Sequence, residues 1–388
     1  MSPAPTEPPP LALYVHLPWC VRKCPYCDFN SHRAGAEPPF PRYVDALLAD
    51  VRHEAGLADG RSLLSIFLGG GTPSLFPPAE IGRLLDGAAR SLTIAADAEV
   101  TMEVNPGTVE CGSPAGYRAA GVNRLSVGAQ TFDDDSLQAI GRIHSSDDIR
   151  RSVAEASAAG FDNFNIDIMY ALPGQTLEMA QADVEAAIRL EPAHISRYQL
   201  TLEPNTVFHA RPPAGLPGEE LAWDMQDAGG ELLVDAGFRQ YEVSAWARDG
   251  RECRHNLNYW RFGDYLAAGA GAHGKVTDRD GVLRYRKIAN PLQYMQAMEA
   301  GEHGAEAEVP DEPGVLFEFM LNALRLVDGF TEAQFEAHTG LPAARLQEAA
   351  KKPLERGLIE RSGDGRWRPT DLGRRFLNDL QAEFLRES

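Results

Sequence analysis

The feature that most constrains the fold is a repeated alternation of short, apolar, β-rich runs with segments of helical spacing. The segments between the runs, such as FPRYVDALLADVRHEAG (40–56), carry apolar residues at helical intervals. Such alternation predicts βαβ units and a parallel sheet. Six units predict an α/β fold with a partial (β/α)6 TIM-like barrel, and a doubly wound sheet is the competing architecture. The six runs are LALYVHL (11–17), LLSIFLGG (63–70), EVTMEVNP (99–106), VNRLSVG (122–128), NFNIDIMY (163–170) and HISRYQLTL (194–202).

The pattern changes after about residue 235, which divides the chain into four predicted parts. Residues 1–10 form a Pro-rich lead that we expect to be disordered, and residues 11–235 form the barrel core. Residues 236–305 mix an aromatic strand, a loop and a Gly-rich stretch. Residues 306–388 read as helices at 315–327, 331–338 and 342–356, a short hairpin and a last helix at 370–386. That order predicts a C-terminal, helical, winged-helix-like domain.

Composition excludes several classes of partner. The formal net charge of -19 disfavours binding to the nucleic-acid backbone. We therefore expect the winged-helix-like part to be a structural lid or packing domain rather than a DNA-binding one. No window approaches the ~20 apolar residues of a membrane span. The first residues lack a basic segment followed by an apolar one, so a cytoplasmic location is expected. In a reducing compartment, five cysteines favour metal or redox chemistry over disulfides.

Three of the five cysteines crowd into WCVRKCPYCDFNSH (19–32) with CxxxCxxC spacing. Thiolates such as those of Cys20, Cys24 and Cys27 prefer zinc, copper(I) or iron–sulfur clusters. A structural zinc site would need a fourth ligand, for which His16 or His32 is available. A [4Fe-4S] cluster held by three cysteines would instead leave one iron open to another ligand.

Polar or Gly-rich residues follow each of the next four predicted strands. GGGTP (69–73) follows the second strand, and Glu103, Gln130 and Asp167 lie at the ends of the third, fourth and fifth. Because functional groups of βα barrels sit on the loops after the strands, these residues are expected to converge with the cysteines.

CxxxCxxC with Tyr26 before its last cysteine, followed by GGGTP at the next strand end, resembles the radical S-adenosylmethionine (SAM) superfamily. The resemblance covers roughly residues 11–235 and implies a [4Fe-4S] cluster, SAM on its open iron, and an electron donor to the cluster. In this family an electron from the cluster cleaves SAM. The cluster and SAM contacts that the resemblance implies are Tyr14, Cys20, Cys24, Tyr26, Cys27, Gly70, Gly71, Thr72, Glu103, Gln130, Arg142 and Asp167.

The whole chain resembles the subfamily of oxygen-independent coproporphyrinogen III oxidase, and HNLNYW (255–260) and GAGAHGK (269–275) resemble its haem-chaperone branch. The implied function is binding of haem and its transfer to apoproteins, with a homodimer as an open option. Oxidative decarboxylation of coproporphyrinogen III is the alternative. Against it, Phe29 stands where the oxidase carries a further cysteine, and the segment before the first strand is short.

HNLNYW supplies the candidate haem contacts. His255 is the expected axial ligand of haem iron, with Tyr259 and Trp260 packed on the porphyrin. The competing interpretation is a buried histidine and aromatic residues that fix a turn. Cys253 and His273 are secondary ligand candidates, and Cys111 is expected to be a free thiol.

Overall fold

A computed structural model describes residues 8–107, 112–279, 281–303, 305–363 and 365–385. Most of the predicted N-terminal lead, and Cys111, lie outside these residues.

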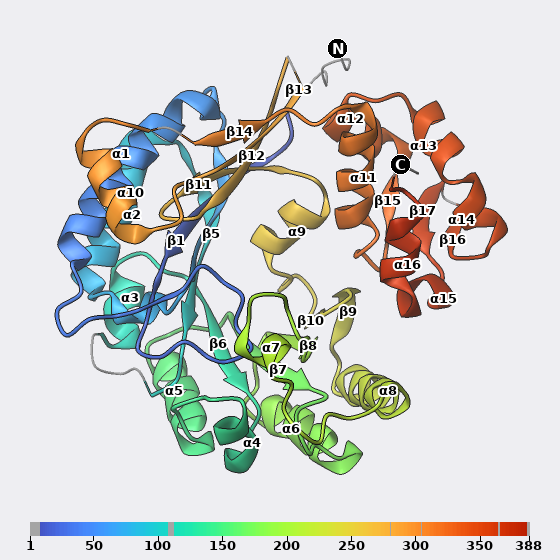
Figure 1. Ribbon diagram of the computed structural model, residues 1–388, viewed down its shortest axis with the longest axis horizontal. Helices are drawn as coiled ribbons and strands as arrows, with labels where there is room; N and C mark the ends of the chain where they lie inside the picture. The colour runs from blue at the N-terminus through green and yellow to red at the C-terminus, as the bar shows by residue number, and fades with distance from the viewer. Residues whose placement is uncertain (1–7, 108–111, 280, 304, 364, 386–388) are drawn as a thin grey trace.

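Six strands from residues 11–199 form the centre of one sheet (Figure 1). They pair in parallel, and their spatial order follows their order in the chain. A doubly wound sheet would reverse that order at a switch point, so the partial (β/α)6 barrel prediction is confirmed. The strands are β1 (Leu11–Leu17), β4 (Leu63–Gly70), β5 (Ile94–Val104), β6 (Arg124–Gln130), β7 (Phe164–Tyr170) and β8 (His194–Gln199).

Both edges of this sheet are extended by strands between residues 239 and 308, which run just past the connecting region predicted at 236–305. Beside β1, β11 (Asp264–Ala268) pairs in parallel. An antiparallel ribbon of β12 (His273–Asp278), β13 (Gly281–Arg286) and β14 (Glu306–Glu308) continues the sheet on that side. Beside β8, β10 (Ala245–Ala247) and β9 (Arg239–Glu242) complete a sheet of twelve described strands.

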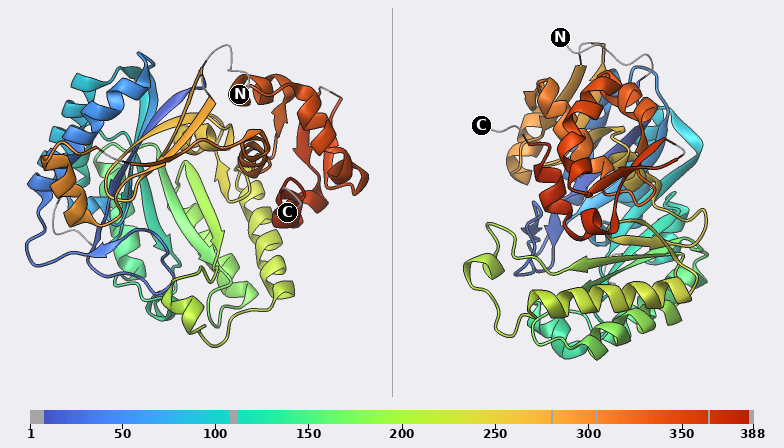
Figure 2. Two further views of the ribbon diagram at one scale, coloured as in Figure 1. Left: turned by 45° about the horizontal axis from the view of Figure 1, so that its top comes forward. Right: turned by 90° about the vertical axis from the view of Figure 1, so that its right-hand side faces the viewer.

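Helices follow the strands along the outer face of the curved sheet, as two further views show (Figure 2). The main core lies between them, where Leu13, Val15 and Leu17 of β1 are buried in the same cluster as Val44 and Leu47 of α1. Local sequence starts several helices, since Ser145 and Asp148 form a capping box and Thr176 caps the next helix. The elements are α1 (Phe40–Ala58), η1 (Pro73–Leu75), α2 (Pro78–Ser91), α3 (Pro114–Ala119), α4 (Asp134–Ala139), α5 (Ser146–Ala158), α6 (Leu177–Arg189), α7 (Val207–Ala210), α8 (Glu219–Asp235), α9 (Arg254–Trp260) and α10 (Pro291–Glu299).

The C-terminal part packs around a separate core that includes Phe319, Phe335 and Trp367. The predicted order of helices, hairpin and helix is present, but two of the predicted helices are divided. The helix predicted at 342–356 is two helices that meet at Ala350. The last predicted helix is also two helices, because Phe376 leaves the helical backbone at φ −113° and ψ 47°. In the described chain, no helix has both the length and the apolar character needed to cross a membrane. The elements are α11 (Glu312–Ala323), β15 (Phe330–Thr331), α12 (Glu332–Thr339), α13 (Ala343–Ala349), α14 (Lys351–Glu355), β16 (Ile359–Arg361), β17 (Arg366–Pro369), α15 (Asp371–Arg375) and α16 (Leu377–Ala382).

Candidate functional site

The three clustered cysteines line one cavity of about 870 Å³ at the carboxyl ends of the central strands. Their loop is closed by a short parallel pair, β2 (Trp19–Cys20) and β3 (His32–Arg33). Asn30 anchors it, because its side-chain amide donates to the carbonyl oxygens of Ala270 at 2.9 Å and Ala289 at 2.8 Å. Burial raises the pKa of Cys20 and Cys27, so metal binding here would release protons.

The GGGTP segment approaches the cysteine loop so closely that only glycine fits. A Cβ at Gly71 would lie 2.6 Å from the carbonyl oxygen of Trp19. Gly70 has a φ of 114°, which favours glycine, and its N–H donates to the Glu103 carboxylate at 3.0 Å. Thr72 lies behind the cavity wall, where its Oγ1 accepts a hydrogen bond from Asn105 at 2.8 Å.

Two carboxyl groups face the same cavity. Burial, with a smaller effect of Asp167, raises the pKa of Glu103 to about 7. Burial also raises the pKa of Asp167, whose oxygens accept hydrogen bonds from Ser126 at 2.9 Å and Asn165 at 2.9 Å. Burial makes each charge costly, so the pair suits a ligand that brings hydroxyl groups or a positive charge.

Arg142 links the cysteine loop to the neighbouring strand ends. Its guanidinium donates to Asn105 Oδ1 at 2.6 Å and to the Gly128 carbonyl at 2.9 Å, and it lies 3.8 Å from Cys24 Sγ. Gln130 ends β6 with a φ of 72° and lines the cavity beside it, as does Tyr26. Burial raises the pKa of Tyr26, which keeps its hydroxyl protonated.

Most of the sequence-predicted residues therefore meet in one place, with three exceptions. Thr72 lies behind the cavity wall, and Tyr14 lines a separate, smaller cavity. His255 is buried and lines neither cavity. The predicted residues on the wall of the larger cavity are Cys20, Cys24, Tyr26, Cys27, Gly70, Gly71, Glu103, Gln130, Arg142 and Asp167.

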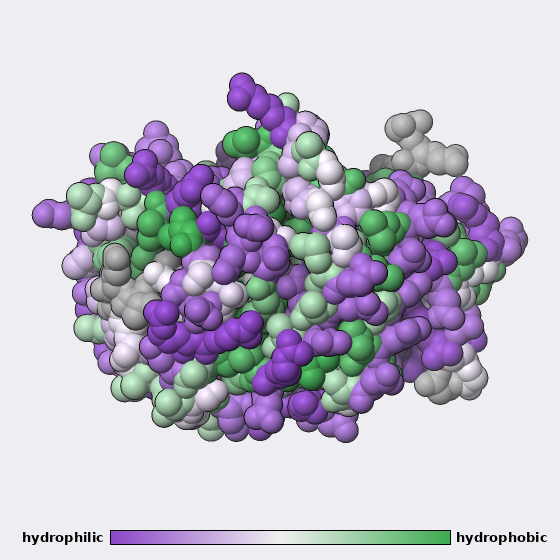
Figure 3. Space-filling view, turned by 90° about the horizontal axis from the view of Figure 1, so that it is seen from below, coloured by the Kyte–Doolittle hydropathy of each residue, from purple (hydrophilic) through white to green (hydrophobic). Residues whose placement is uncertain are grey.

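Residues that the sequence reading missed complete this wall. Asn105 directly follows the third strand, and Arg197 belongs to the sixth. The expectation that functional groups lie at the carboxyl ends of the strands, which located Glu103 and Asp167, also indicates Asn105 and Arg197. The C-terminal part supplies Arg374, Arg375 and Phe376, for which the sequence offers no local signal. Seen from below, the molecule is mostly hydrophilic at its rim, with small hydrophobic patches nearer the middle (Figure 3).

HNLNYW forms α9, a helix that packs against β1, β4 and α11. Its N-terminus is capped by the Glu99 carboxylate, which accepts from the N–H groups of Arg254 and His255 at 3.2 Å each and from Cys253 Sγ at 3.5 Å. Cys253 is buried at this cap, and burial raises its pKa to about 12.

Both ring nitrogens of His255 are occupied. Nδ1 forms a hydrogen bond with Ser65 Oγ at 2.9 Å, and Nε2 forms one with the Tyr259 hydroxyl at 3.0 Å. The side chain is 1% exposed, and burial lowers its pKa to about 3. In this conformation His255 is not available to a metal ion.

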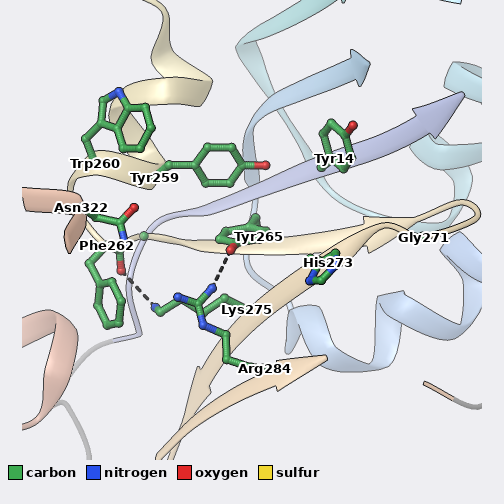
Figure 4. A pocket seen from close by; sticks show the side chains of 11 residues that line it. Tyr14, Tyr259, Trp260, Phe262, Tyr265, Gly271, His273, Lys275, Arg284 and Asn322 are labelled. Atoms are coloured by element: carbon green, nitrogen blue, oxygen red, sulfur yellow. Dashed lines mark hydrogen bonds between the residues drawn. The ribbon is translucent and has the colours of Figure 1, made fainter. Parts of the chain in front are cut away.

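A second cavity, of about 320 Å³, lies between α9 and the strands β11, β12 and β13 (Figure 4). Tyr259 and Trp260 of HNLNYW line it from the helix, and Tyr265 and His273 line it from the strands. Trp260 also lines the larger cavity, so it is a shared wall.

The described residues contain no three histidine, cysteine, aspartate or glutamate side chains arranged as ligands of a single metal ion. A four-iron cluster does not need such convergence, because each thiolate binds a different iron. Three cysteines on one loop, facing a cavity lined by polar strand ends, fit that group.

Comparison with known proteins agrees with the geometry. A model of the radical SAM superfamily matches residues 14–187, and a model of the HemN C-terminal domain matches residues 311–376. "Heme chaperone HemW" from Escherichia coli (strain K12) is 47% identical over 380 residues, covering 98% of this chain and 99% of the relative. "Heme chaperone HemW" from Haemophilus influenzae is 45% identical over 98% of this chain and 99% of the relative.

Among solved structures, the coproporphyrinogen III oxidase HemN from Escherichia coli superposes with a TM-score of 0.80. It is 23% identical, and the match covers 97% of this chain and 90% of that one, so the likeness establishes a shared fold. The full-length similarity to the HemW proteins is much closer. The chain therefore belongs to the HemW family within the radical SAM superfamily, and this membership implies a [4Fe-4S] cluster and SAM.

Proposed function

We propose that this protein is a haem chaperone of the radical SAM type, which binds a [4Fe-4S] cluster, SAM and haem and transfers haem to apoproteins. The observation that carries the proposal is similarity to the HemW proteins along almost the entire chain. The cavity geometry supports it, because the three cysteines and the polar strand ends line one wall.

The residues on that wall divide into two groups. Cys20, Cys24 and Cys27 would hold three irons of the cluster. The neighbouring side chains and backbone would hold SAM: Tyr26, Gly70, Gly71, Glu103, Gln130, Arg142 and Asp167, with Tyr14 and Thr72 supporting them from behind. A bound cluster would supply single-electron chemistry toward SAM, for which an electron donor to the cluster would be needed.

Individual groups have distinct parts in this arrangement. Arg142, already held by Asn105 and the Gly128 carbonyl, offers a fixed cation for a carboxylate. The Gly70 N–H orients the Glu103 carboxylate toward the cavity, where that carboxylate suits an ammonium group or ribose hydroxyls. Glycine at 70 and 71 leaves room for a ligand beside the backbone.

Anaerobic reconstitution tests the cluster and SAM. Full-length protein should take up about four irons per chain, and SAM should change the cluster spectrum. Cys24→Ser should lose the cluster, whereas Cys253→Ser should keep it, because Cys253 is buried beside Glu99 at the start of α9 and does not line the cavity. Stoichiometric zinc without iron would contradict the proposal.

Haem transfer is tested separately, by mixing haem-loaded protein with a haem-free acceptor and following the acceptor spectrum. Transfer should require reconstituted protein. We propose a cytoplasmic location, apoprotein acceptors and no nucleic-acid partner; a homodimer is to be tested by sedimentation with and without haem.

Oxidative decarboxylation of coproporphyrinogen III is the second candidate, and the shared fold with coproporphyrinogen III oxidase favours it. Phe29 argues against it, because it stands where the oxidase carries a cysteine and lies on the wall of the larger cavity. Anaerobic incubation with coproporphyrinogen III, SAM and a reductant decides the question. Release of protoporphyrinogen IX would contradict the chaperone proposal and favour the decarboxylation reaction.

A further inference from the structure

We propose that the smaller cavity, between α9 and the strands β11–β13, binds haem and that His273 rather than His255 is the histidine that binds its iron. This inference rests on the proposed haem-chaperone function and assigns it a place in the fold. The cavity is separate from the wall that carries the three cysteines.

Aromatic rings from two directions build the cavity. Tyr259 of α9 and Tyr265 of β11 lie edge to face, with ring centroids 4.4 Å apart, and Trp260 follows on the same helix (Figure 4). Flat apolar ligands pack well against such rings. A volume of about 320 Å³ is near the lower end for ligand sites. The cavity would therefore cover part of a porphyrin and leave an edge open, which suits cargo that is passed on.

His273 is the histidine on this wall. It begins β12, it is exposed, and no hydrogen bond to its ring is present among the residues that the structure describes. His255 has both nitrogens bonded and lines neither cavity. Partial desolvation of its ring, together with the nearby cations of Arg286 and Arg284, lowers the pKa of His273, which favours the neutral imidazole that metals bind.

The cations around the cavity differ in their availability for haem carboxylates. Lys275 is buried, and its ammonium group donates hydrogen bonds to Asp264, Thr277 and the Phe262 carbonyl. Arg284 is held by Glu318 and the Tyr265 hydroxyl.

Arg286 lies directly opposite His273 in the β12–β13 register, and its side chain is 59% exposed. Among the residues that the structure describes, its side chain pairs with the exposed Glu306, so it can turn to a haem carboxylate at small cost.

One end of the cavity touches the cysteine loop. Gly271 lines the cavity, and a Cβ there would lie 2.3 Å from the Asn30 side chain, which anchors the loop. The proposed haem site and the cluster loop therefore share a contact through the turn between β11 and β12.

Anaerobic titration of reconstituted full-length protein with ferric haem tests the assignment. Wild type should give the Soret band of histidine-bound haem, and His273→Ala should lose that band and bind at least tenfold more weakly. His53→Ala, which removes an exposed histidine of α1, should behave as wild type. His255→Ala, checked for its fold by circular dichroism, should keep the wild-type band.

A second titration, with iron-free protoporphyrin IX, separates ligation from packing. His273→Ala should bind this porphyrin as wild type does, because the imidazole acts only through iron, whereas Trp260→Ala should bind it more weakly. A wild-type haem spectrum in His273→Ala, or loss of the band in folded His255→Ala alone, would overturn the assignment. If wild type binds no haem at all, the proposed function itself fails.

Discussion

At the scale of single residues, burial raises the pKa of the carboxyl groups that face the larger cavity. Glu103 is the clearest case, because its pKa is raised to about 7. In the unfolded chain the same carboxyl has a pKa near 4.5. Between these two pH values the folded state binds the proton and the unfolded state does not. The contribution of Glu103 to stability is therefore present at low pH and is lost as pH rises toward 7.

Replacing Glu103 by Gln should remove this dependence. Between pH 5 and pH 8 the free energy of unfolding of the wild type should fall relative to that of Glu103→Gln, by about 1–2 kcal/mol after allowance for solvent. Urea unfolding of the cluster-free protein at both pH values measures the difference. Asp86→Asn on α2, an exposed position, should keep the wild-type slope. Identical slopes in wild type and Glu103→Gln would refute the account.

The order of strands along the chain predicted that Glu103, Gln130 and Asp167 would lie beside the cysteines, because the carboxyl ends of parallel strands meet at one edge. The sequence left open whether His255 would bind haem iron or be a buried histidine, and the structure encloses it. That outcome depends on Ser65, 190 positions away, and on Tyr259, one turn along a helix that the motif alone did not reveal.

At the scale of elements, the position of α9 determines the shape of the candidate sites, since this helix separates the two cavities. The helix is short, from Arg254 to Trp260, and helices of this length need external support. Glu99 gives that support from β5 by accepting three hydrogen bonds at the helix start. Its carboxylate also lies 3.9 Å from the buried guanidinium of Arg124.

Replacing Glu99 by Gln should loosen α9. The variant keeps one acceptor oxygen but loses the charge that favours the helix start and balances Arg124, so unfolding should become easier by about 2 kcal/mol. Amide hydrogen exchange should rise in residues 254–260. Asp97→Asn, on the same strand but with an 81% exposed side chain, is the control and should change little. Equal effects of the two substitutions would show that Glu99 does not support the helix.

At the scale of the whole molecule, the C-terminal part is joined to the sheet edge at β9. The Val243 N–H donates to the Arg325 carbonyl at 3.1 Å, and the Arg325 side chain donates to Glu242 at 2.8 Å. The same guanidinium lies 4.3 Å from the ring centre of Trp260. This junction places Arg374, Arg375 and Phe376 on the wall of the larger cavity.

Arg325→Ala should weaken the junction, because it leaves the buried Glu242 carboxylate without its cation. Burial already raises the pKa of Glu242, and loss of Arg325 would raise it further. We expect a loss of about 2 kcal/mol in the free energy of unfolding. Protease cleavage in the 302–310 segment should also be faster. Arg239→Ala removes a more exposed arginine that also pairs with the C-terminal part, through Asp328, and should cost under about 1 kcal/mol. Comparable losses in both variants would contradict this view of the junction.

The sequence by itself determined the six central strands, the helices between them and the loop that carries the three cysteines. These depend on local apolar periodicity and on short spacing, which neighbours along the chain define. Only the tertiary structure decided that residues 236–305 extend both sheet edges, that the C-terminal part lines the larger cavity, and that His273 rather than His255 faces an open one. The physical reason is that burial and hydrogen bonding of a side chain are set by partners far away in the sequence, such as Ser65 for His255 and Glu242 for Arg325.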